Sequence, residues 1–220
     1  MPKKPGDSLG GGERLMNVAT EDQRGSALGV VLAGGLARRI GGAKATVQLG
    51  GRPLVSYALE ALAAAGLESV VVAKADTPLP HLDVPVWVEE PLPRHPAHGI
   101  TCALERAGRP IVAVGCDTPF LPPLLLSTLA ELDVPLAIVE SAQGLEPLPG
   151  RYSPSLAPSL VIASRGNGSL RGAVERLQPH RLSADELRRY GDPAALLLNV
   201  NTRDDLRHAE TLLEKLPRQP

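Results

Sequence analysis

The sequence has few aromatic residues, few cysteines and almost no net charge. Aromatic residues make up 2% of its 220 residues, which argues against binding of single-stranded nucleic acid, because that function needs aromatic platforms for base stacking. The formal net charge of −1 provides no overall basic field to attract a nucleic acid or a membrane surface. We therefore expect neither of these partners.

The cysteines and the apolar runs exclude further classes. Cys102 and Cys116 are the only cysteines, too few for a disulfide framework and not spaced as a CxxC zinc pair. We predict that both are reduced, small apolar residues. No apolar run reaches the ~18–20 residues of a membrane span, and the N-terminus lacks the apolar stretch of a secretory signal. The sequence therefore predicts a cytoplasmic protein.

Composition changes near residue 27. Residues 1–26 are rich in glycine and charged residues, with GGG at 10–12; they offer too little apolar surface to offset the entropy of ordering, so we predict a disordered N-terminal tail. Residues 27–216 contain no internal repeat and no convincing linker. A chain of this length is typical of one α/β domain. We predict a single domain over residues 27–216.

Short apolar runs alternate with segments of helical periodicity. In the first part we predict strands at 27–33, 68–74, 84–90, 109–117 and 134–140, and helices at 53–66, 98–107 and 122–132. This alternation predicts parallel βαβ units in a Rossmann-like, three-layer α/β fold with a mostly parallel sheet. In the less regular remainder we predict strands at 145–153 and 196–202, and helices at 154–164, 168–178, 183–190 and 202–216.

Residues 30–44 read VVLAGGLARRIGGAK and have the form of an anion-binding loop. Gly34 and Gly35 follow a predicted strand, at the edge where open parallel sheets bind ligands. Glycine lets backbone N–H groups approach phosphate oxygens, and Arg39 and Lys44 add positive charge. The spacing matches neither GxxxxGK[ST] nor GxGxxG. A plain turn with solvated arginines is the alternative to a phosphate-binding loop.

Asp117 ends the apolar run VAVGC at the end of a predicted strand. A carboxylate there is costly unless it is satisfied or faces a ligand. It could cap the following helix, but the cap position would be nearer residues 120–121. Mg²⁺ usually takes one or two carboxylates together with substrate phosphates and waters. We therefore favour Asp117 as a magnesium ligand.

Four stretches in the same order resemble nucleotidyltransferases with an LAGGxxxRMGxxK loop, and most closely the molybdenum cofactor guanylyltransferase family. They are VVLAGGLARRIGGAK with GGRPL (50–54), GCDTPFLPP (115–123), LEPLPGRYS (145–153) and LLLNVNTRDDL (196–206). The resemblance covers residues from about 28 to 212. Each motif alone is moderately specific, and four in the right order are specific.

The resemblance implies a Rossmann-like enzyme that transfers GMP from GTP to molybdenum-molybdopterin, with Mg²⁺, forming molybdopterin guanine dinucleotide and pyrophosphate. It implies transient contact with molybdoenzymes or their chaperones. Lys44 would bind the triphosphate and Asp117 the metal, as the catalytic residues. The nucleotide-binding residues would be Leu32, Ala33, Gly34, Gly35, Arg39, Lys44, Lys74, Glu89 and Asp117. Those on the pterin side would be Glu146, Asn199 and Asn201.

Several positions leave alternatives open. Ala43 stands where the family usually has aspartate, Lys74 where it has a base-contacting asparagine, and HPAHG (95–99) where it has GPLAG. Glu89 is equally well explained as a solvated strand end. Thr202 and Asp205 form a capping-box pattern, which is compatible with asparagines facing a cleft.

Other functions are compatible with parts of the pattern. A CTP-dependent enzyme acting on the same cofactor or a GTP-dependent enzyme acting on phospholactate would share the fold, although Gly34-Gly35 rather than Ala-Gly favours guanine by resemblance. Sugar-1-phosphate nucleotidyltransferases and glycosyltransferases tend to be longer or to carry a DxD motif, which is absent here. A non-catalytic nucleotide-binding homologue is a further alternative.

Overall fold

The computed structural model describes residues 27–37 and 42–215. The predicted tail (residues 1–26) and Arg39 lie outside the described residues. Within the described part of the chain, no helix is long and apolar enough to cross a membrane. Strands and helices alternate through most of it, as the sequence predicts.

The strands are β1 (Leu28–Leu32), β2 (Leu36–Ala37), β3 (Gly42–Ala43), β4 (Gln48–Leu49), β5 (Arg52–Pro53), β6 (Ser69–Lys74), β7 (Val86–Glu89), β8 (Ile111–Gly115), β9 (Leu136–Ser141), β10 (Gly144–Tyr152) and β11 (His180–Leu182). The helices are α1 (Leu54–Ala64), α2 (Pro96–Ala107), α3 (Pro123–Glu131), α4 (Ala157–Arg165), α5 (Leu170–Arg176), α6 (Ala184–Leu187), α7 (Pro193–Leu196) and α8 (Arg203–Lys215). The strands and helices predicted between residues 27 and 140 are confirmed.

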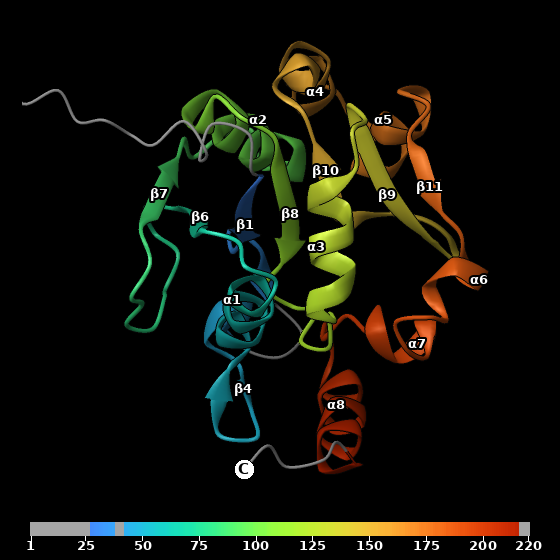
Figure 1. Cartoon of the computed structure of the whole chain (residues 1–220). Helices are drawn as coiled ribbons and strands as arrows, with labels where there is room; N and C mark the ends of the chain where they lie inside the picture. The colour runs from blue at the N-terminus through green and yellow to red at the C-terminus, as the bar shows by residue number, and fades with distance from the viewer. Residues whose placement is uncertain (1–26, 38–41, 216–220) are drawn as a thin grey trace, which may run out of the picture.

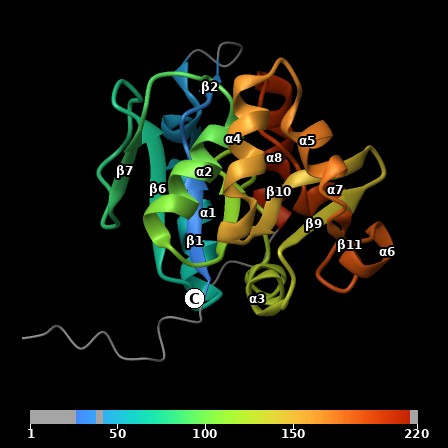
Figure 2. The same cartoon turned by 90° about the horizontal axis from the view of Figure 1, so that it is seen from above.

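A seven-stranded sheet forms the middle of the domain, in the order β11-β9-β10-β8-β1-β6-β7, with β7 and β11 at opposite edges (Figure 2). β1 pairs in parallel with β6 and β8, and β6 pairs in parallel with β7. β10 is antiparallel to both of its neighbours. The predicted mostly parallel sheet is therefore confirmed.

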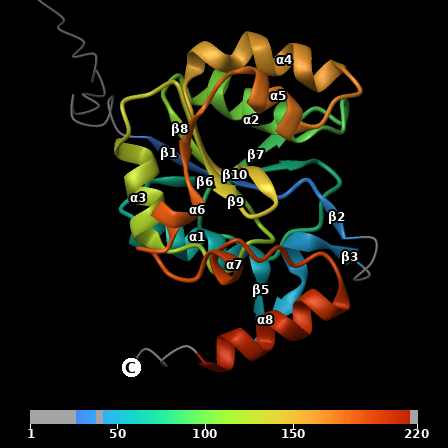
Figure 3. The same cartoon turned by 90° about the vertical axis from the view of Figure 1, so that its right-hand side faces the viewer.

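Helices cover both faces of the sheet, giving three layers (Figures 1 and 3). Buried residues of α1, α3 and α6 pack on one face, and those of α2, α4 and α5 on the other. The central strands β1 and β8 read LGVVL and IVAVG and are almost wholly buried, as expected for parallel strands that are covered on both faces. With so few aromatic residues, valine, leucine, alanine and isoleucine fill nearly all of the core.

A bulge in β10 directs one side chain toward the cavity described below. The register between β9 and β10 shifts between Glu146 and Gly150. The buried Tyr152 hydroxyl donates a hydrogen bond of 2.6 Å to the Pro147 carbonyl oxygen inside the bulge. A Cβ at Gly150 would lie 2.7 Å from that same oxygen. The bulge lets Leu148 leave the alternation of the strand and line the cavity.

The prediction of a late strand at 196–202 is wrong. Residues Pro193–Leu196 form α7, and the chain then crosses the carboxyl end of the sheet without joining it. The Val200 N–H donates a single 2.9 Å hydrogen bond to the Asp117 carbonyl oxygen, and the Val200 side chain is buried in a small cluster against β4 and α8. A short apolar segment that is buried by side-chain packing has the same sequence pattern as a buried strand, which explains the wrong prediction.

The sequence analysis did not predict several short strands. β11 adds a parallel edge strand beside β9, and two small hairpins, β2–β3 and β4–β5, precede α1. Each is only two or three residues long. Such segments are too short to show a hydrophobic period, so only tertiary contacts define them.

The β4–β5 hairpin supports α8, which lies beside it in Figure 3. Gly50 in this hairpin has a positive φ of 56°, and a Cβ there would lie 2.5 Å from Leu213 Cδ2 of α8. Gly66, after α1, has a φ of 75° with no atom within 4 Å of the corresponding position. The two glycines share a left-handed backbone, but only a Cβ added at Gly50 would meet another element.

We expect Gly50→Ala to be more destabilising than Gly66→Ala. Both substitutions place a Cβ in the left-handed region, which costs about 1–2 kcal/mol, and Gly50→Ala also crowds Leu213, at roughly another 1 kcal/mol. Urea unfolding of the two variants measures the difference. In a Leu213→Ala background the extra loss at Gly50 should vanish; if it persists, α8 does not dock as described.

Candidate functional site

A cavity of about 400 Å³ opens at the carboxyl ends of β1, β6 and β8. Because β6 lies on one side of β1 and β8 on the other, the strand order reverses here, and open α/β sheets bind ligands at such a point. The structure brings together in its lining most of the residues predicted for the nucleotide: Leu32, Gly34, Gly35, Lys44, Lys74, Glu89 and Asp117. Ala33 is fully buried behind the lining, and Arg39 lies outside the described residues.

Glycines keep the cavity open. A Cβ at Gly34 would lie 2.8 Å from Glu89 Oε1, and a Cβ at Gly99 would lie 3.3 Å from Glu89 Oε2. At Gly115 a Cβ would overlap Asp117 Oδ1. By contrast, a Cβ at Gly35 would meet only Lys44 Cδ at 3.6 Å. The closest approaches are therefore those between the backbone and the two acidic side chains.

Lys74 and Glu89 form a buried ion pair at one end of the cavity. Their side chains are 7% and 8% exposed, and Lys74 Nζ lies 3.3 Å from Glu89 Oε1. Lys74 Nζ also donates a 2.8 Å hydrogen bond to the Glu90 carbonyl oxygen. The two residues end the neighbouring strands β6 and β7, where their Cα atoms are register partners. Glu89 is thus not a solvated strand end, whereas Glu90 is exposed.

Lys44 joins the glycine-rich loop to two distant segments. Its Nζ lies 2.5 Å from Asp117 Oδ2, at the end of β8, and it donates a hydrogen bond to Asn201 Oδ1, just before α8. Asp117 and Lys44 are each only partly exposed. In water an exposed ion pair contributes little, but partial burial strengthens the attraction between these charges.

Cys116 lies beside this cluster and lines the cavity. Burial, with a further contribution from the negative charge of Asp117, raises the pKa of the Cys116 thiol to about 12. The thiol therefore stays protonated at neutral pH and is no nucleophile, because reactivity requires the thiolate. Both cysteines are free, as predicted, although Cys102 is only half-buried.

The HPAHG segment starts α2 at the rim of the cavity. His95 Nδ1 accepts a 3.1 Å hydrogen bond from the Ala97 N–H and caps the helix. His95 Nε2 lies 2.9 Å from the Gly168 carbonyl oxygen, in the loop before α5. Both contacts are satisfied by a neutral ring that carries its proton on Nε2. His95 therefore links α2 to the loop before α5, and Arg94, His95 and Pro96 line the cavity.

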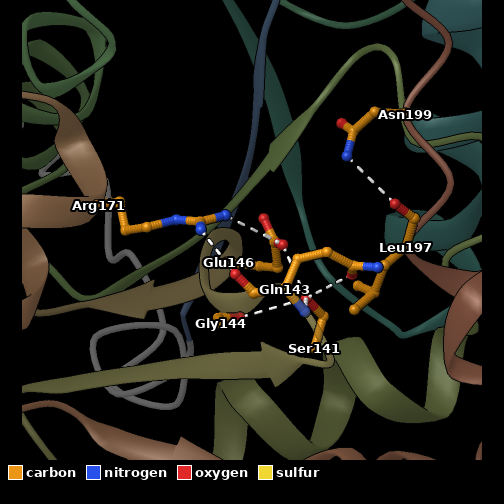
Figure 4. Close-up of polar contacts among 7 residues, drawn as sticks. All are labelled: Ser141, Gln143, Gly144, Glu146, Arg171, Leu197 and Asn199. Atoms are coloured by element: carbon orange, nitrogen blue, oxygen red, sulfur yellow. Dashed lines mark hydrogen bonds and ion pairs between the residues drawn. The ribbon is translucent and has the colours of Figure 1, made fainter.

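The residues predicted for the pterin side do not share their hydrogen-bond partners, and Figure 4 shows those of Glu146 and Asn199. Glu146 Oε1 accepts hydrogen bonds from Ser141 Oγ at 2.9 Å and Arg171 Nη2 at 3.2 Å. Asn199 is exposed and donates a 3.1 Å hydrogen bond to the Leu197 carbonyl oxygen. Of these three predicted residues, only Asn201 reaches Lys44 in the structure.

The capping pattern next to Asn201 is confirmed. The N–H groups of Asn201 and Thr202 donate to Asp205 Oδ2 at 3.0 and 2.8 Å, and the Asp205 N–H donates to Thr202 Oγ1 at 3.1 Å. Burial alone would raise the pKa of Asp205, but these hydrogen bonds hold it below its usual value. The start of α8 is therefore fixed by Asp205, and Asn201 keeps its side chain for Lys44.

The sequence analysis assigned no role to several residues in or near the cavity, although Gly99 and Leu148 lie within the HPAHG and LEPLPGRYS stretches. Arg94, Gly99 and Leu148 line the cavity, and Arg171 holds Glu146 and donates 2.9 Å to the Gln143 carbonyl oxygen. Arg171 follows Ser169, the N-cap of α5, and its sequence context reads as ordinary helix surface. A bulge and a helix start place Leu148 and Arg171, and the local hydrophobic pattern reveals neither.

The donor set fits a cation that arrives with its ligand. No group of three or more His, Cys, Asp or Glu side chains among residues 27–37 and 42–215 could hold a metal ion. Asp117 offers one carboxylate, whose described side-chain partner is the Lys44 ammonium. Mg²⁺ commonly binds through one or two carboxylates and takes its other ligands from substrate phosphates and water. Asp117 therefore suits a nucleotide-borne cation rather than a preformed protein cage.

Comparisons with known proteins agree with this geometry. The family model of the MobA-like NTP transferase domain matches residues 29–182. A molybdenum cofactor guanylyltransferase from Cereibacter sphaeroides is 32% identical over 195 residues, covering 85% of this chain and 97% of that protein. The molybdopterin-guanine dinucleotide biosynthesis protein A of Archaeoglobus fulgidus is 26% identical, with a TM-score of 0.73 over 86% of this chain and 99% of that one.

A more distant structure, Rv0371c of Mycobacterium tuberculosis in complex with manganese, is 20% identical, with a TM-score of 0.63 over 87% of this chain and all of that one. At that identity the likeness establishes the fold alone. The family match, in contrast, spans the sheet from β1 to β11, including the loop that carries Lys44 and the strand that leads to Asp117. The chain belongs to the MobA-like NTP transferase family.

Proposed function

We propose that this protein transfers GMP from GTP to molybdenum-molybdopterin, forming molybdopterin guanine dinucleotide and releasing pyrophosphate. The observation that carries the proposal is the contact of Lys44 with both Asp117 and Asn201. Lys44 is predicted to bind the triphosphate, Asp117 to bind the metal and Asn201 to contact the acceptor. The names of the relatives favour GTP over CTP and this acceptor over a sugar phosphate or phospholactate.

The cavity provides different chemistry at its two ends. Lys74 and Glu89 offer directional hydrogen-bonding groups at one end, suited to a nucleobase. Gly35 and Lys44 offer a backbone N–H group and a positive charge away from this pair, suited to phosphates, and Gly34 lies against Glu89. A nucleoside triphosphate lying between these ends would direct its α-phosphate toward Lys44, Asp117 and Asn201.

The acceptor would enter from the side of Asn201, Glu146 and Asn199. Arg171 is about half exposed and is held by Glu146 and the Gln143 carbonyl oxygen. A guanidinium fixed in this way suits a planar polar heterocycle or a phosphate. We propose that Asn201 and Asn199 orient the acceptor. The contact with molybdoenzymes or their chaperones and the cytoplasmic location stay predictions from the sequence.

In the proposed reaction the terminal phosphate oxygen of the pterin forms a bond to the α-phosphorus of GTP. The bond from that phosphorus to the bridging oxygen of the β-phosphate breaks, and pyrophosphate leaves with the electron pair. The attacking phosphate is already ionised, so no general base is needed. The protein would contribute positioning and charge neutralisation, mainly through Lys44 and the loop amides.

We propose Mg²⁺ as the cation, held by Asp117 together with the phosphates. When bound, it would neutralise the negative charge that develops on the phosphates. The Asp117 carboxylate has Lys44 as its counter-ion in the ligand-free protein. If a cation bound to Asp117 together with the triphosphate, Lys44 could move from Asp117 to the phosphates. The Asp117 carboxylate would then be neutralised by the cation, and the Lys44 ammonium by the phosphates.

Nucleotide selectivity tests the proposal directly. We expect GTP with Mg²⁺ to raise the melting temperature more than CTP, ATP or UTP, because a ligand that binds only the folded state stabilises it. We also expect pyrophosphate release to require both GTP and molybdenum-molybdopterin. Preferential stabilisation by CTP, or release with a sugar phosphate as acceptor, would reassign the substrate.

Replacement of Asp117 tests the metal ligand. We expect Asp117→Asn to fold and to bind GTP, but to lose roughly a hundredfold or more in turnover, because a charge that acts mainly in the transition state is removed. Steady-state kinetics over a range of Mg²⁺ concentrations measures the loss. Asp83→Asn, at an exposed residue whose described ion pair is with His81, is the matched control. Turnover like that of the control would remove Asp117 from the mechanism.

Replacement of Lys44 tests the triphosphate contact. We expect Lys44→Ala to weaken GTP about tenfold to a hundredfold, the worth of a charge-assisted contact, and to weaken GMP less, because GMP lacks the β- and γ-phosphates. Calorimetric titration of both nucleotides measures the two losses, with the exposed Lys215→Ala as control. Equal losses for GTP and GMP would mean that Lys44 does not reach the outer phosphates.

A further inference from the structure

Both ring nitrogens of His95 are engaged, and each has a different partner. Nδ1 accepts the 3.1 Å hydrogen bond from the Ala97 N–H at the start of α2, and Nε2 lies 2.9 Å from the Gly168 carbonyl oxygen, in the loop between α4 and α5. An amide N–H can only donate and a carbonyl oxygen can only accept, so these partners fix the neutral ring with its proton on Nε2. The side chain therefore joins two segments that are 73 residues apart.

The cap of α2 does not by itself require histidine. The residues preferred at an N-cap are asparagine, aspartate, serine and threonine, whose short side chains reach the N–H groups of the first helical turn. In the family pattern the first position of HPAHG is glycine, which has no side chain. The imidazole ring of His95 differs from all of these in presenting a second nitrogen farther from the backbone, and this is the atom that meets Gly168. The contact with the loop is therefore what histidine adds in this chain.

The loop that His95 contacts has few other restraints. Residues 166–168 read GNG, and a Cβ added at Gly168 would find no atom within 4 Å. The Gly166 N–H donates a 3.3 Å hydrogen bond to the Ala163 carbonyl oxygen, within α4. Of the hydrogen bonds described for residues 166–168, the one to His95 is the one that reaches beyond the adjoining helices. Because glycine-rich segments have the greatest backbone freedom, this bond restricts the loop to one position.

The loop leads directly into the first turn of α5. Ser169 caps this helix, and Arg171 lies in its first turn. The Arg171 guanidinium lies 3.2 Å from Glu146 Oε1 and donates a 2.9 Å hydrogen bond to the Gln143 carbonyl oxygen (Figure 4). At the other end of the connection, His95 lines the cavity. Contacts therefore run without a break from the wall of the cavity, through the loop, to Arg171.

We propose that His95 is a positioning residue that ties Arg171, and with it the acceptor side, to the wall of the cavity. The hydrogen bond from Nε2 to Gly168 fixes where α5 begins, so that the Arg171 guanidinium meets the acceptor at a set place relative to the nucleotide. Small displacements of a group that orients a substrate are costly to the reaction. This inference rests on the proposed function, since it takes Arg171 as a contact of the acceptor.

Two substitutions separate the contact with Gly168 from the cap. Asparagine is a preferred N-cap, but its amide ends where the ring has Cδ2, one bond short of Nε2; His95→Asn should keep the cap and lose the contact. Glutamine is not a preferred N-cap, but its amide nitrogen reaches as far as Nε2; His95→Gln should keep the contact and lose the cap. His81→Asn, at an exposed histidine, is the matched control.

We expect His95→Asn to raise the KM for molybdenum-molybdopterin about twofold to tenfold, the worth of one hydrogen bond, and to leave the dissociation constant of GTP unchanged. We expect His95→Gln to lower the melting temperature and to keep the wild-type KM. Steady-state pyrophosphate release measures KM, and calorimetric titration measures GTP binding. In the ligand-free protein, amide hydrogen exchange should be faster over residues 166–172 in His95→Asn, and faster at the start of α2 in His95→Gln.

A double-mutant cycle tests whether His95 acts through Arg171. Arg171→Ala should itself raise the KM for molybdenum-molybdopterin, and the addition of His95→Asn should raise it no further. Independent, multiplying increases would mean that His95 does not act through Arg171, and would overturn the inference. An equal change in the acceptor KM and in the dissociation constant of GTP would overturn it too, because His95 would then act as part of the cavity wall.

Failure of the inference and failure of the proposed function give different results. If the wild-type protein releases pyrophosphate with GTP and molybdenum-molybdopterin, and His95→Asn has the KM of the His81→Asn control, only the inference is overturned. If the wild-type protein releases no pyrophosphate with these substrates, the proposed function fails and the role of His95 toward the acceptor fails with it. A raised acceptor KM in His95→Asn, absent in His95→Gln and in the Arg171→Ala background, supports both.

Discussion

The Lys44 ammonium is the contact on which the geometry of the site depends. It is bonded to Asp117 at the end of β8 and to Asn201 before α8, and it follows the glycine-rich loop that leaves β1. Three segments separated by 73 and 157 residues therefore converge on one positive charge. Such convergence requires that β1 and β8 be neighbours and parallel, so that their carboxyl ends meet at one edge of the sheet. The fold supplies this adjacency, and through it Lys44 links the glycine-rich loop to Asp117 and Asn201.

Glycine residues, which have no side chain, shape the cavity as much as the side chains that line it. Gly34, Gly99 and Gly115 all lie where a Cβ would press on Glu89 or Asp117, so the two carboxylates can approach the backbone closely. Burial of charge at both ends is tolerated because each carboxylate has a lysine beside it. The two ion pairs differ in environment. The pair of Asp117 and Lys44 is partly exposed, which suits a mobile ligand such as a metal-bound triphosphate. The pair of Glu89 and Lys74 is buried, which suits a fixed hydrogen-bonding pattern.

Local contacts hold the residues that are proposed for the acceptor side. Asp205 caps α8 and so holds the segment that carries Asn201. Glu146 fixes Arg171 across the gap between β10 and α5, and His95 bonds the loop before α5 to the start of α2. These contacts link the second half of the domain to the rim of the cavity, although the sequence there has no regular alternation. The proposed acceptor side is therefore assembled from caps and loop contacts rather than from strand ends.

The sequence by itself determined the alternation of strands and helices from β1 to β9, the position of Asp117 at a strand end and the glycine-rich loop, because buried parallel strands and glycine turns leave local patterns. It also determined the family, through four motifs in order. Only the tertiary structure decided that the chain after α7 passes the carboxyl end of the sheet instead of joining it. It also decided that Glu89 is buried against Lys74 while Asn199 faces solvent. A bulge brings Leu148 into the cavity lining, and a helix start places Arg171 beside Glu146. Each of these outcomes depends on which distant segment packs against the residue, and a local hydrophobic period carries no information about that partner.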